Sequence, residues 1–323
     1  EGFKYPVIDR NRCVECGKCV RTCPITNKQK KNSVVDSYIA INNDKNQREA
    51  SASGGLFSVI AHYVLEKNGV VFGAAYDEEL RVKHTAIEHE ADLEKLRMSK
   101  YVQSDLGDTF KQVDKYLKAD RIVLFSGTPC QVAGLRAYIN REDANLILLD
   151  LVCHGVPSPK LFEDYKAALS EKYESDIQNI YFRSKVLGHH LSTIAVRFSN
   201  GKLIHSRRLV KSYPRLWFAG FTSRPSCYAC SFKEEDRVSD FTLFDSFKSA
   251  GQYDFKDDDM GLSNVYVRTQ KATDLWKQIE AQVTAVKTKT AVTNKNDGDM
   301  IYESAVKNKA RAEFWSDYGK LSY

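Results

Sequence analysis

The chain has 323 residues, of which 42% are hydrophobic and 11% aromatic, so it can bury a large core and is not a disordered protein. Its longest apolar run, at 145–153, is interrupted by Asp150 and is much shorter than the ~18–20 residues of a membrane helix, so we expect no membrane span. The formal net charge is +6, but five or six consecutive Lys or Arg residues never occur, so we expect no nucleic-acid partner.

The first 33 residues contain a dense run of cysteines. Their spacing is C-x2-C-x2-C-x3-C, followed by proline, and they are Cys13, Cys16, Cys19 and Cys23. In bacterial ferredoxins this pattern holds [4Fe-4S] clusters, and the fourth cysteine ligates the second cluster. Zinc sites more often use two separated C-x2-C pairs, and a disulfide knot suits a small secreted chain. We therefore predict a ferredoxin-like iron–sulfur module over 1–33.

The next region, 34–175, alternates strands with helices. We expect strands over 37–42, 70–76, 121–126 and 146–151, and helices over 56–68, 108–118, 132–140 and 159–173. Continuous apolar strands between helices are typical of an α/β fold with a buried sheet. A Ser/Gly-rich turn at 50–55 opens the first of these helices. Its free N–H groups would suit a phosphate, although serine also caps helices for structural reasons.

The pattern changes in the third region, 176–323. Alternating strands over 180–182, 194–198 and 203–205, with a hairpin turn at 199–201, indicate an antiparallel piece. Further strands are expected over 240–244 and 264–268, and helices over 272–282 and 299–314. The predicted fold class is therefore α/β, with α+β character in the second half.

Four more cysteines lie far apart in the sequence. Cys130 and Cys153 each follow a predicted strand, and Cys227 and Cys230 form a C-x2-C pair in a loop. Because the carboxyl ends of neighbouring strands face one crevice, we expect these cysteines to bind a second [4Fe-4S] cluster. Alternatively, Cys23 exchanges with one of them, or Cys130 and Cys153 are simply buried apolar residues. Reduced thiols indicate a cytoplasmic protein in a low-oxygen setting.

Several motifs together resemble the coenzyme F420 hydrogenase/dehydrogenase beta-subunit family. They are Ser53-Gly54-Gly55, Gly73-Ala74, Ser-Lys-Tyr-Val-Gln-Ser at 99–104, Leu-Phe-Ser-Gly-Thr-Pro-Cys-Gln at 124–131, Asp-Leu-Val-Cys-His-Gly at 150–155, and Arg-Pro-Ser-Cys at 224–227 with Cys230. The resemblance implies FAD and one or more [4Fe-4S] clusters, with a mixed-sheet flavin-binding region over 34–175. One departure lies at 240–248, where Phe244 and Phe247 replace the Gly and Trp that the family pattern leads us to expect. If this run touches the flavin or the substrate, the substrate differs from that of better-known members.

The resemblance also implies which residues hold the flavin. They are Ser53, Gly54, Gly55, Ser99, Lys100, Tyr101, Gln103, Ser104, Gly127 and Thr128. Glycines let backbone approach a pyrophosphate, and Lys100 would neutralise it, unless Lys100 is an ordinary surface lysine. The sequence contains no G-x-G-x-x-G motif, so a Rossmann NAD site is not expected.

These features predict an iron–sulfur flavoprotein oxidoreductase. Electrons would pass between a one-electron donor such as ferredoxin, two [4Fe-4S] clusters, FAD and an organic small-molecule substrate, sugar-related or otherwise anionic, because a flavin joins one-electron to two-electron chemistry. His189 and His190 are the candidate catalytic residues, with a solvated pair as the alternative. His154 is expected to donate a hydrogen bond beside the cluster. Basic residues at 183–208 would bind an anionic substrate or an acidic ferredoxin, or are solvated strand faces.

Two other functions remain open. One is an electron-transfer subunit that oxidises or reduces a deazaflavin, coenzyme F420, for a partner enzyme. The other is a family member that keeps its clusters for structure and has lost its flavin. The sequence also leaves a homo-oligomer open.

Overall fold

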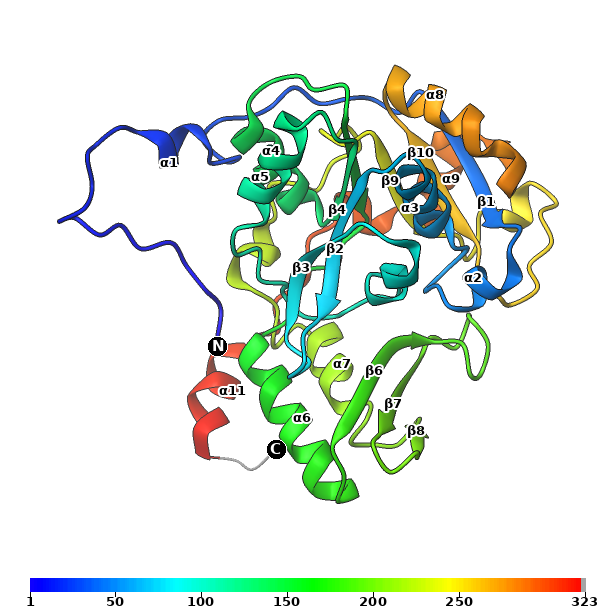
Figure 1. Ribbon diagram of the computed structural model, residues 1–323. Coiled ribbons are helices and arrows are strands. Elements are labelled where there is room, and N and C mark those ends of the chain that lie inside the picture. The colour runs from blue at the N-terminus through cyan, green and yellow to red at the C-terminus, as the bar shows by residue number, and fades with distance from the viewer. Residues whose placement is uncertain (321–323) are drawn as a thin grey trace.

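The computed structural model describes residues 1–320 and is built around one large sheet (Figure 1). The sheet has eight strands in the order β11-β1-β10-β9-β5-β4-β2-β3. Their bounds are β1 Asp36–Asn42, β2 Val70–Tyr76, β3 Val82–Ile87, β4 Val123–Gly127, β5 Leu146–Leu151, β9 Phe241–Asp245, β10 Ser263–Val267 and β11 Val283–Thr288. Strands β2, β4, β5 and β9 are parallel, and β1 runs the same way because β10, antiparallel to both, separates it from β9. Five carboxyl ends therefore share one edge of the sheet.

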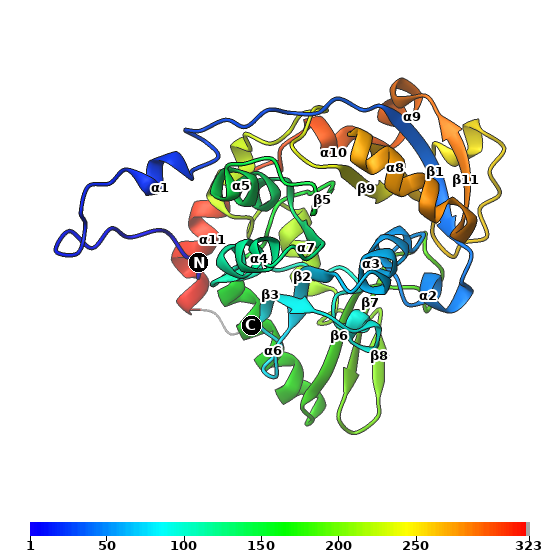
Figure 2. The same cartoon turned by 45° about the horizontal axis from the view of Figure 1, so that its top comes forward.

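Helices cover both faces of this sheet. Helices α3 (Leu56–Glu66) and α8 (Gln270–Ile279) pack on one face, and α4 (Thr109–Lys118) and α5 (Pro129–Ile139) on the other (Figure 2). The strands serve both cores because their side chains alternate: in β5, Ile147 and Leu149 join the first core, whereas Leu146 and Leu148 join the second.

A small antiparallel sheet forms a second lobe with its own core. It consists of β6 (Ile177–Ser184), β7 (Thr193–Phe198) and β8 (Leu203–His205), in that order, with α6 (Pro159–Tyr173) and α7 (Ser212–Phe218). Its aromatic core includes Phe162, Phe182 and Tyr213, and it also takes in Val82 and Val102 from the large-sheet region. The lobe therefore packs beside the edge where the parallel strands end. The region predicted over 176–323 supplies strands to both sheets, because β9, β10 and β11 return to the large one.

The first 33 residues form an arm that projects from the body (Figure 1). Its one helix is α1 (Lys18–Arg21). Both ends of the arm are anchored: Arg311 donates to the Glu1 carboxylate at 2.6 Å, and Asn32 forms a backbone bridge with Arg237.

The remaining helices are short. They are α2 (Lys45–Glu49), α9 (Thr290–Asp297), α10 (Asp299–Tyr302), α11 (Arg311–Asp317) and the 3₁₀ turns η1 (Glu90–Lys95), η2 (Pro225–Ala229), η3 (Ala250–Gln252), η4 (Glu280–Gln282) and η5 (Tyr318–Lys320). None of the helices within residues 1–320 is both long and apolar enough to cross a membrane.

The predicted fold class is confirmed, and the strands over 70–76 and 146–151 and the helix over 159–173 have the expected bounds. The predicted helix over 299–314 is wrong. The chain leaves the helix after Tyr302 because tertiary contacts replace helical ones: Ala305 is buried, and the Asn308 N–H donates to the Gly220 carbonyl at 3.2 Å. Strands β3 and β11 were not anticipated.

Candidate functional site

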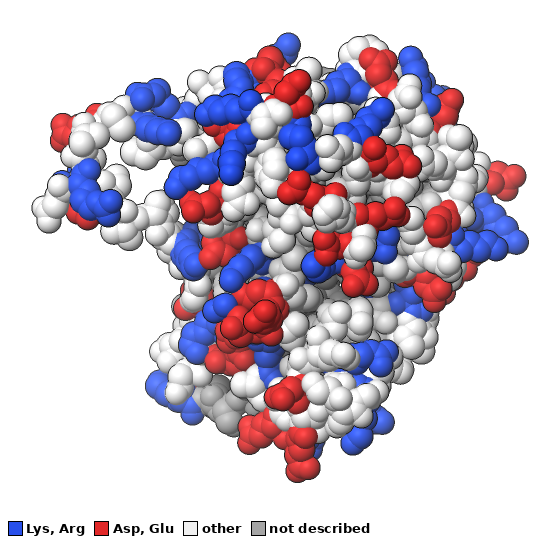
Figure 3. All heavy atoms as spheres, viewed as in Figure 1, with Lys and Arg blue, Asp and Glu red and all other residues white. Residues whose placement is uncertain are grey.

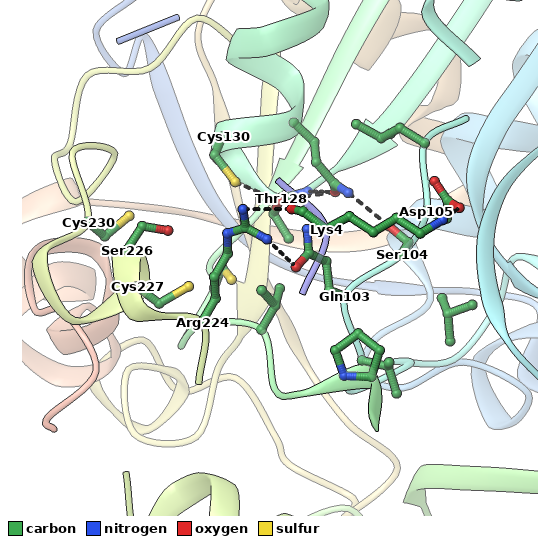
Figure 4. A pocket seen from close by; sticks show the side chains of 18 of the residues that line it. Lys4, Gln103, Ser104, Asp105, Thr128, Cys130, Arg224, Ser226, Cys227 and Cys230 are labelled. Carbon is green, nitrogen blue, oxygen red and sulfur yellow. Dashed lines mark hydrogen bonds and ion pairs between the residues drawn. The ribbon is translucent and has the colours of Figure 1, made fainter. Parts of the chain in front are cut away.

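A cavity of about 1200 Å³ lies at the carboxyl-end edge of the large sheet (Figure 4). Four cysteines from three chain segments line it. Cys130 stands in the first turn of α5, directly after β4, and Cys153 follows β5. Cys227 lies in η2 and Cys230 directly follows it. The sulfur atoms of Cys130, Cys227 and Cys230 point into the same space in Figure 4, and Cys153 lines the same cavity, so the structure brings together the four cysteines expected to bind a second cluster.

The state of these thiols suits a site that is completed by metal. All eight cysteines of the chain are free of disulfides. Burial, followed by the neighbouring thiols, raises the pKa of Cys153 to about 12, and burial is also the main cause that raises the pKa of Cys227 to about 11. Iron binds thiolates, and a bound metal would remove the protons that burial now favours.

The spacing of the thiols differs from that of a single-ion site. Within residues 1–320, no group of three or more Cys, His, Asp or Glu side chains is placed to hold a metal ion as it stands. A cubane cluster spreads its four thiolates over four different irons, so its ligands stand further apart than those of one zinc ion. Four cysteines around a cavity fit such a cluster.

Cations and backbone anchors surround the cysteine wall. The Lys233 ammonium donates to the carbonyl oxygens of Cys153 and Met300, both at 2.6 Å. The Cys230 N–H donates to the Ser304 hydroxyl at 3.0 Å. Arg237, also on the cavity wall, lies 3.4 Å from the buried Asp150 carboxylate. Because a four-cysteine cluster is anionic, the nearby cations would offset its charge. Sequence reasoning missed Lys233, since no motif marks it.

The cysteines of the arm are arranged differently. Cys13, Cys16 and Cys19 are exposed, and Cys23 is half-buried. Backbone N–H groups of Thr26 and Ile25 lower the pKa of the Cys23 thiol. Pro24 and Ile25 line the cavity, so the chain directly after Cys23 reaches it. Both partitions of the eight ligands therefore remain compatible with this placement.

The residues assigned to the flavin fall into two groups. Gln103, Ser104 and Thr128 line the cavity, whereas Ser99, Tyr101 and Gly127 are not part of its wall. Gln103 accepts a hydrogen bond from Arg224 at 2.9 Å.

The loop at 53–55 also lies outside the cavity wall and has internal partners. The Ser53 hydroxyl donates to the Leu262 carbonyl at 2.6 Å. A Cβ on Gly54 would come within 2.6 Å of the Ala40 carbonyl oxygen, so close backbone packing explains this glycine. Gly55 has φ 85° at the N-cap of α3, a conformation that favours glycine.

Lys100 is engaged within the body. Its ammonium donates to the carbonyl oxygens of Lys95 and Arg97 at 2.8 and 2.6 Å, and burial lowers its pKa to about 7. Tyr101 packs on the rings of Phe182 and Trp217. Tyr101 therefore ties the small lobe to the large sheet region, whereas Lys100 is bound by carbonyl groups of the preceding segment.

The two candidate catalytic histidines lie away from the cavity wall. His189 is 2% exposed, and its Nε2 lies 3.0 Å from Arg183 and 3.3 Å from the Asp245 carboxylate. Arg183 also pairs with Asp245 at 2.7 Å, which helps to hold the pKa of that carboxyl well below its usual range. The side chain of Phe247 stacks on His189 with ring centroids 5.1 Å apart. The divergent 240–248 run thus supplies two of the four members of this cluster.

The polar residues near His189 also have partners within the protein. His190 is half-exposed and bonded to Asp259 at 3.0 Å. Lys185 donates to the carbonyl oxygens of Arg48 and Ser53. His154 lines the cavity and packs on Trp217 and Phe218, and burial lowers its pKa.

Comparisons with known proteins agree with this architecture. A family model for the C-terminal part of the coenzyme F420 hydrogenase/dehydrogenase beta subunit matches residues 120–308, and a 4Fe-4S dicluster domain matches residues 5–52. The only cysteines within the dicluster match are the four of the arm, since residues 24–52 contain none. No curated protein matches the sequence.

A solved structure shares the fold. A chain of the F420-reducing [NiFe] hydrogenase complex from Methanosarcina barkeri is 15% identical, with a TM-score of 0.54, over 84% of this chain and 89% of that one. The predicted ferredoxin-like iron–sulfur module agrees with the dicluster match. Since the family match covers more than half of the residues, the chain belongs to the coenzyme F420 hydrogenase/dehydrogenase beta-subunit family of iron–sulfur oxidoreductases.

Proposed function

We propose that this chain is an iron–sulfur electron-transfer subunit that exchanges electrons with a deazaflavin such as coenzyme F420. The observation that carries the proposal is the convergence of Cys130, Cys153, Cys227 and Cys230 on one cavity of about 1200 Å³. A [4Fe-4S] cluster on this wall and another on the arm would use all eight cysteines. The fold shared with a chain of an F420-reducing hydrogenase complex supports the deazaflavin as the two-electron partner.

The rest of the cavity fits a flavin. Its volume exceeds the roughly 300–1,000 Å³ of common ligand pockets, so space remains beside a cluster. Leu106, Phe110 and Phe162 supply apolar wall for a ring system. The basic residues of the wall, which suit the phosphates of FAD, include Lys4, Lys83, Lys160 and Arg224. When bound, FAD supplies the conversion between one-electron and two-electron transfer.

The charge distribution points to the arm as the surface that meets a one-electron partner. Residues 1–33 hold eight of the 48 Lys and Arg but only three of the 42 Asp and Glu, which leaves 40 and 39 for the body. Figure 3 shows several Lys and Arg along the projecting arm with few acidic side chains among them, whereas both signs are mixed over the body. Within residues 1–320, Arg10, Arg12 and Arg21 form no ion pair. An acidic carrier such as ferredoxin would be steered to such a surface.

The test is anaerobic purification followed by iron, sulfide and flavin analysis and a deazaflavin assay. About eight irons and one FAD per chain, with reduced F420 driving the reduction of a viologen dye, are the expected results. Iron at about four per chain would contradict the two-cluster proposal. Full iron without flavin would leave an electron carrier that does not act on a deazaflavin.

A second candidate is an enzyme with its own anionic organic substrate. The divergent 240–248 run favours it, because Asp245 and Phe247 hold His189 and Arg183 in one buried group. In this candidate, His189 lies beside Asp245 and contacts the substrate, and Arg183 orients an anion. Flavin reoxidation by an anionic substrate, with no turnover of F420, would select it over the first proposal.

A further inference from the structure

Two side chains that are not cluster ligands reach the cysteine wall. We infer that the Thr128 hydroxyl and the Lys233 ammonium raise the reduction potential of the cluster bound by Cys130, Cys153, Cys227 and Cys230. This inference rests on the proposed function, because it requires a cluster at that wall.

The Thr128 hydroxyl lies within hydrogen-bonding distance of a candidate ligand. Its Oγ1 is 3.2 Å from the Cys130 sulfur and 3.1 Å from the Gln131 side-chain oxygen. The hydroxyl has one proton, so it can donate to only one of these two atoms at a time. A protonated Cys130 can itself donate, which leaves the threonine proton for Gln131. A metal-bound thiolate can only accept a hydrogen bond, and its negative charge makes it a stronger acceptor than the Gln131 oxygen. The Thr128 hydroxyl then donates to the Cys130 sulfur.

A chain of hydrogen bonds holds Gln131 in place for this exchange. The Gln131 oxygen already accepts the Thr128 N–H at 3.0 Å, so it stays satisfied when the hydroxyl turns away. Its amide nitrogen donates to Ser104 at 2.8 Å. The Ser104 hydroxyl then donates to His84 Nδ1 at 2.9 Å, and His84 Nε2 donates to the Ser126 carbonyl at 3.0 Å. Burial keeps His84 neutral by lowering its pKa to about 4, which agrees with this direction of donation.

Lys233 acts by charge rather than by a bond to sulfur. Its ammonium is fixed by the Cys153 and Met300 carbonyls, and it interacts electrostatically with the thiols of Cys153, Cys230 and Cys227. Reduction adds one negative charge to the cluster. A fixed cation and a hydrogen bond to a ligand sulfur both stabilise the more negative state, so each raises the potential.

The test is a redox titration of the full-length protein, loaded with iron and followed by electron paramagnetic resonance. In Thr128→Val and in Lys233→Met, we expect one of the two cluster signals to shift to lower potential. At a fixed potential its reduced-to-oxidised ratio should fall roughly tenfold, which is about 59 mV for a one-electron couple. Thr128→Ser and Lys233→Arg keep the hydroxyl and the charge and should restore the wild-type potential. Lys202→Met, at the exposed β7–β8 turn, controls for loss of any lysine.

The outcomes separate this inference from the proposed function. Two signals and full iron, with neither signal moved in Thr128→Val or Lys233→Met, would overturn the inference alone. A wild-type protein with about four irons and a single signal that survives Cys153→Ser would overturn both. If one of these two variants loses its iron, the potential measured in the other still tests the inference, because Thr128 and Lys233 lie in separate segments of the chain.

Discussion

The two groups of cysteines show two ways of building an iron–sulfur site. The arm carries its four within eleven residues, on a segment where three of them are exposed and the single helix has no buried residue. The cavity group spans a hundred residues of sequence, and two of its members, the exposed Cys130 and the half-buried Cys153, follow β4 and β5 of the packed sheet. The first site is encoded by local spacing, whereas the second is encoded by the fold.

This difference has an energetic meaning. An arm without a core of its own depends on its metal for order, because metal binding then supplies the free energy of folding. The cavity wall is supported by packed strands and by contacts such as Cys230 to Ser304, so the body should keep its shape when iron is lost.

The largest effect is expected from removing single ligands. Cys16→Ser and Cys153→Ser should each remove one complete cluster, so iron should fall from about eight to about four per chain in both variants. Electron transfer through the missing cluster should stop. Iron and sulfide analysis, with resonance spectra of each variant, measures this. Loss of iron from both sites in Cys23→Ser would instead favour the partition in which Cys23 serves the inner cluster.

A second large effect is expected from chelation. When iron is stripped, trypsin should cut at Arg10, Arg12 and Arg21 roughly a hundredfold faster, because the cleavage rate follows the population of the open arm. The body should remain intact under the same conditions. Mass spectrometry of the fragments over time gives the rates. Simultaneous degradation of arm and body would show that the cavity site also depends on metal for its fold.

Sequence reasoning succeeded where one segment carries the signal. Continuous apolar runs predicted β2 and β5, and the rule that parallel strands end at one edge placed Cys130 and Cys153 together. It failed for β11, whose side chains are mostly outward-facing and whose place in the sheet is set by pairing with β1. The tail was expected to be helical, yet its Ser304 hydroxyl accepts a hydrogen bond from the Cys230 N–H and so helps to hold the Cys230 loop.

The surroundings of the site were harder to predict than its ligands. Asp245 meets Arg183 across 62 residues, and Lys233 meets the Cys153 carbonyl across 80. Such contacts depend on how segments far apart in the sequence pack together, and no periodicity or spacing encodes them. His84 gave no signal either, because the strand β3 that turns its side chain inward was not predicted from the sequence.

A smaller effect is expected from the charge of the arm. The double variant Arg10→Glu/Arg12→Glu should slow reduction by an acidic ferredoxin about tenfold at low salt, because steering of the partner is lost. Reduction by methyl viologen should be unchanged. The matched control is Arg207→Glu/Arg208→Glu, which alters two exposed arginines of the small lobe. Stopped-flow rates over a range of salt concentrations test this, and equal slowing in both variants would locate the docking surface elsewhere.

The smallest effect concerns the proton balance of His84. Burial is the main cause that lowers its pKa to about 4, so the unfolded chain binds more protons between pH 4 and about 6.5, and stability falls as the pH falls through that window. Between pH 7.5 and pH 6, this histidine alone should remove roughly 0.8 kcal/mol from the free energy of unfolding. His84→Gln can keep the hydrogen bonds to Ser104 and Ser126 but has no proton to bind in this range. Anaerobic urea unfolding of the wild type and of His84→Gln at pH 7.5 and pH 6 measures the contribution of His84 to the free energy of unfolding. Acid lability of the clusters affects both proteins equally and therefore cancels. An identical pH dependence in wild type and variant would mean that the bonded chain from His84 to Thr128 also accommodates a charged imidazole.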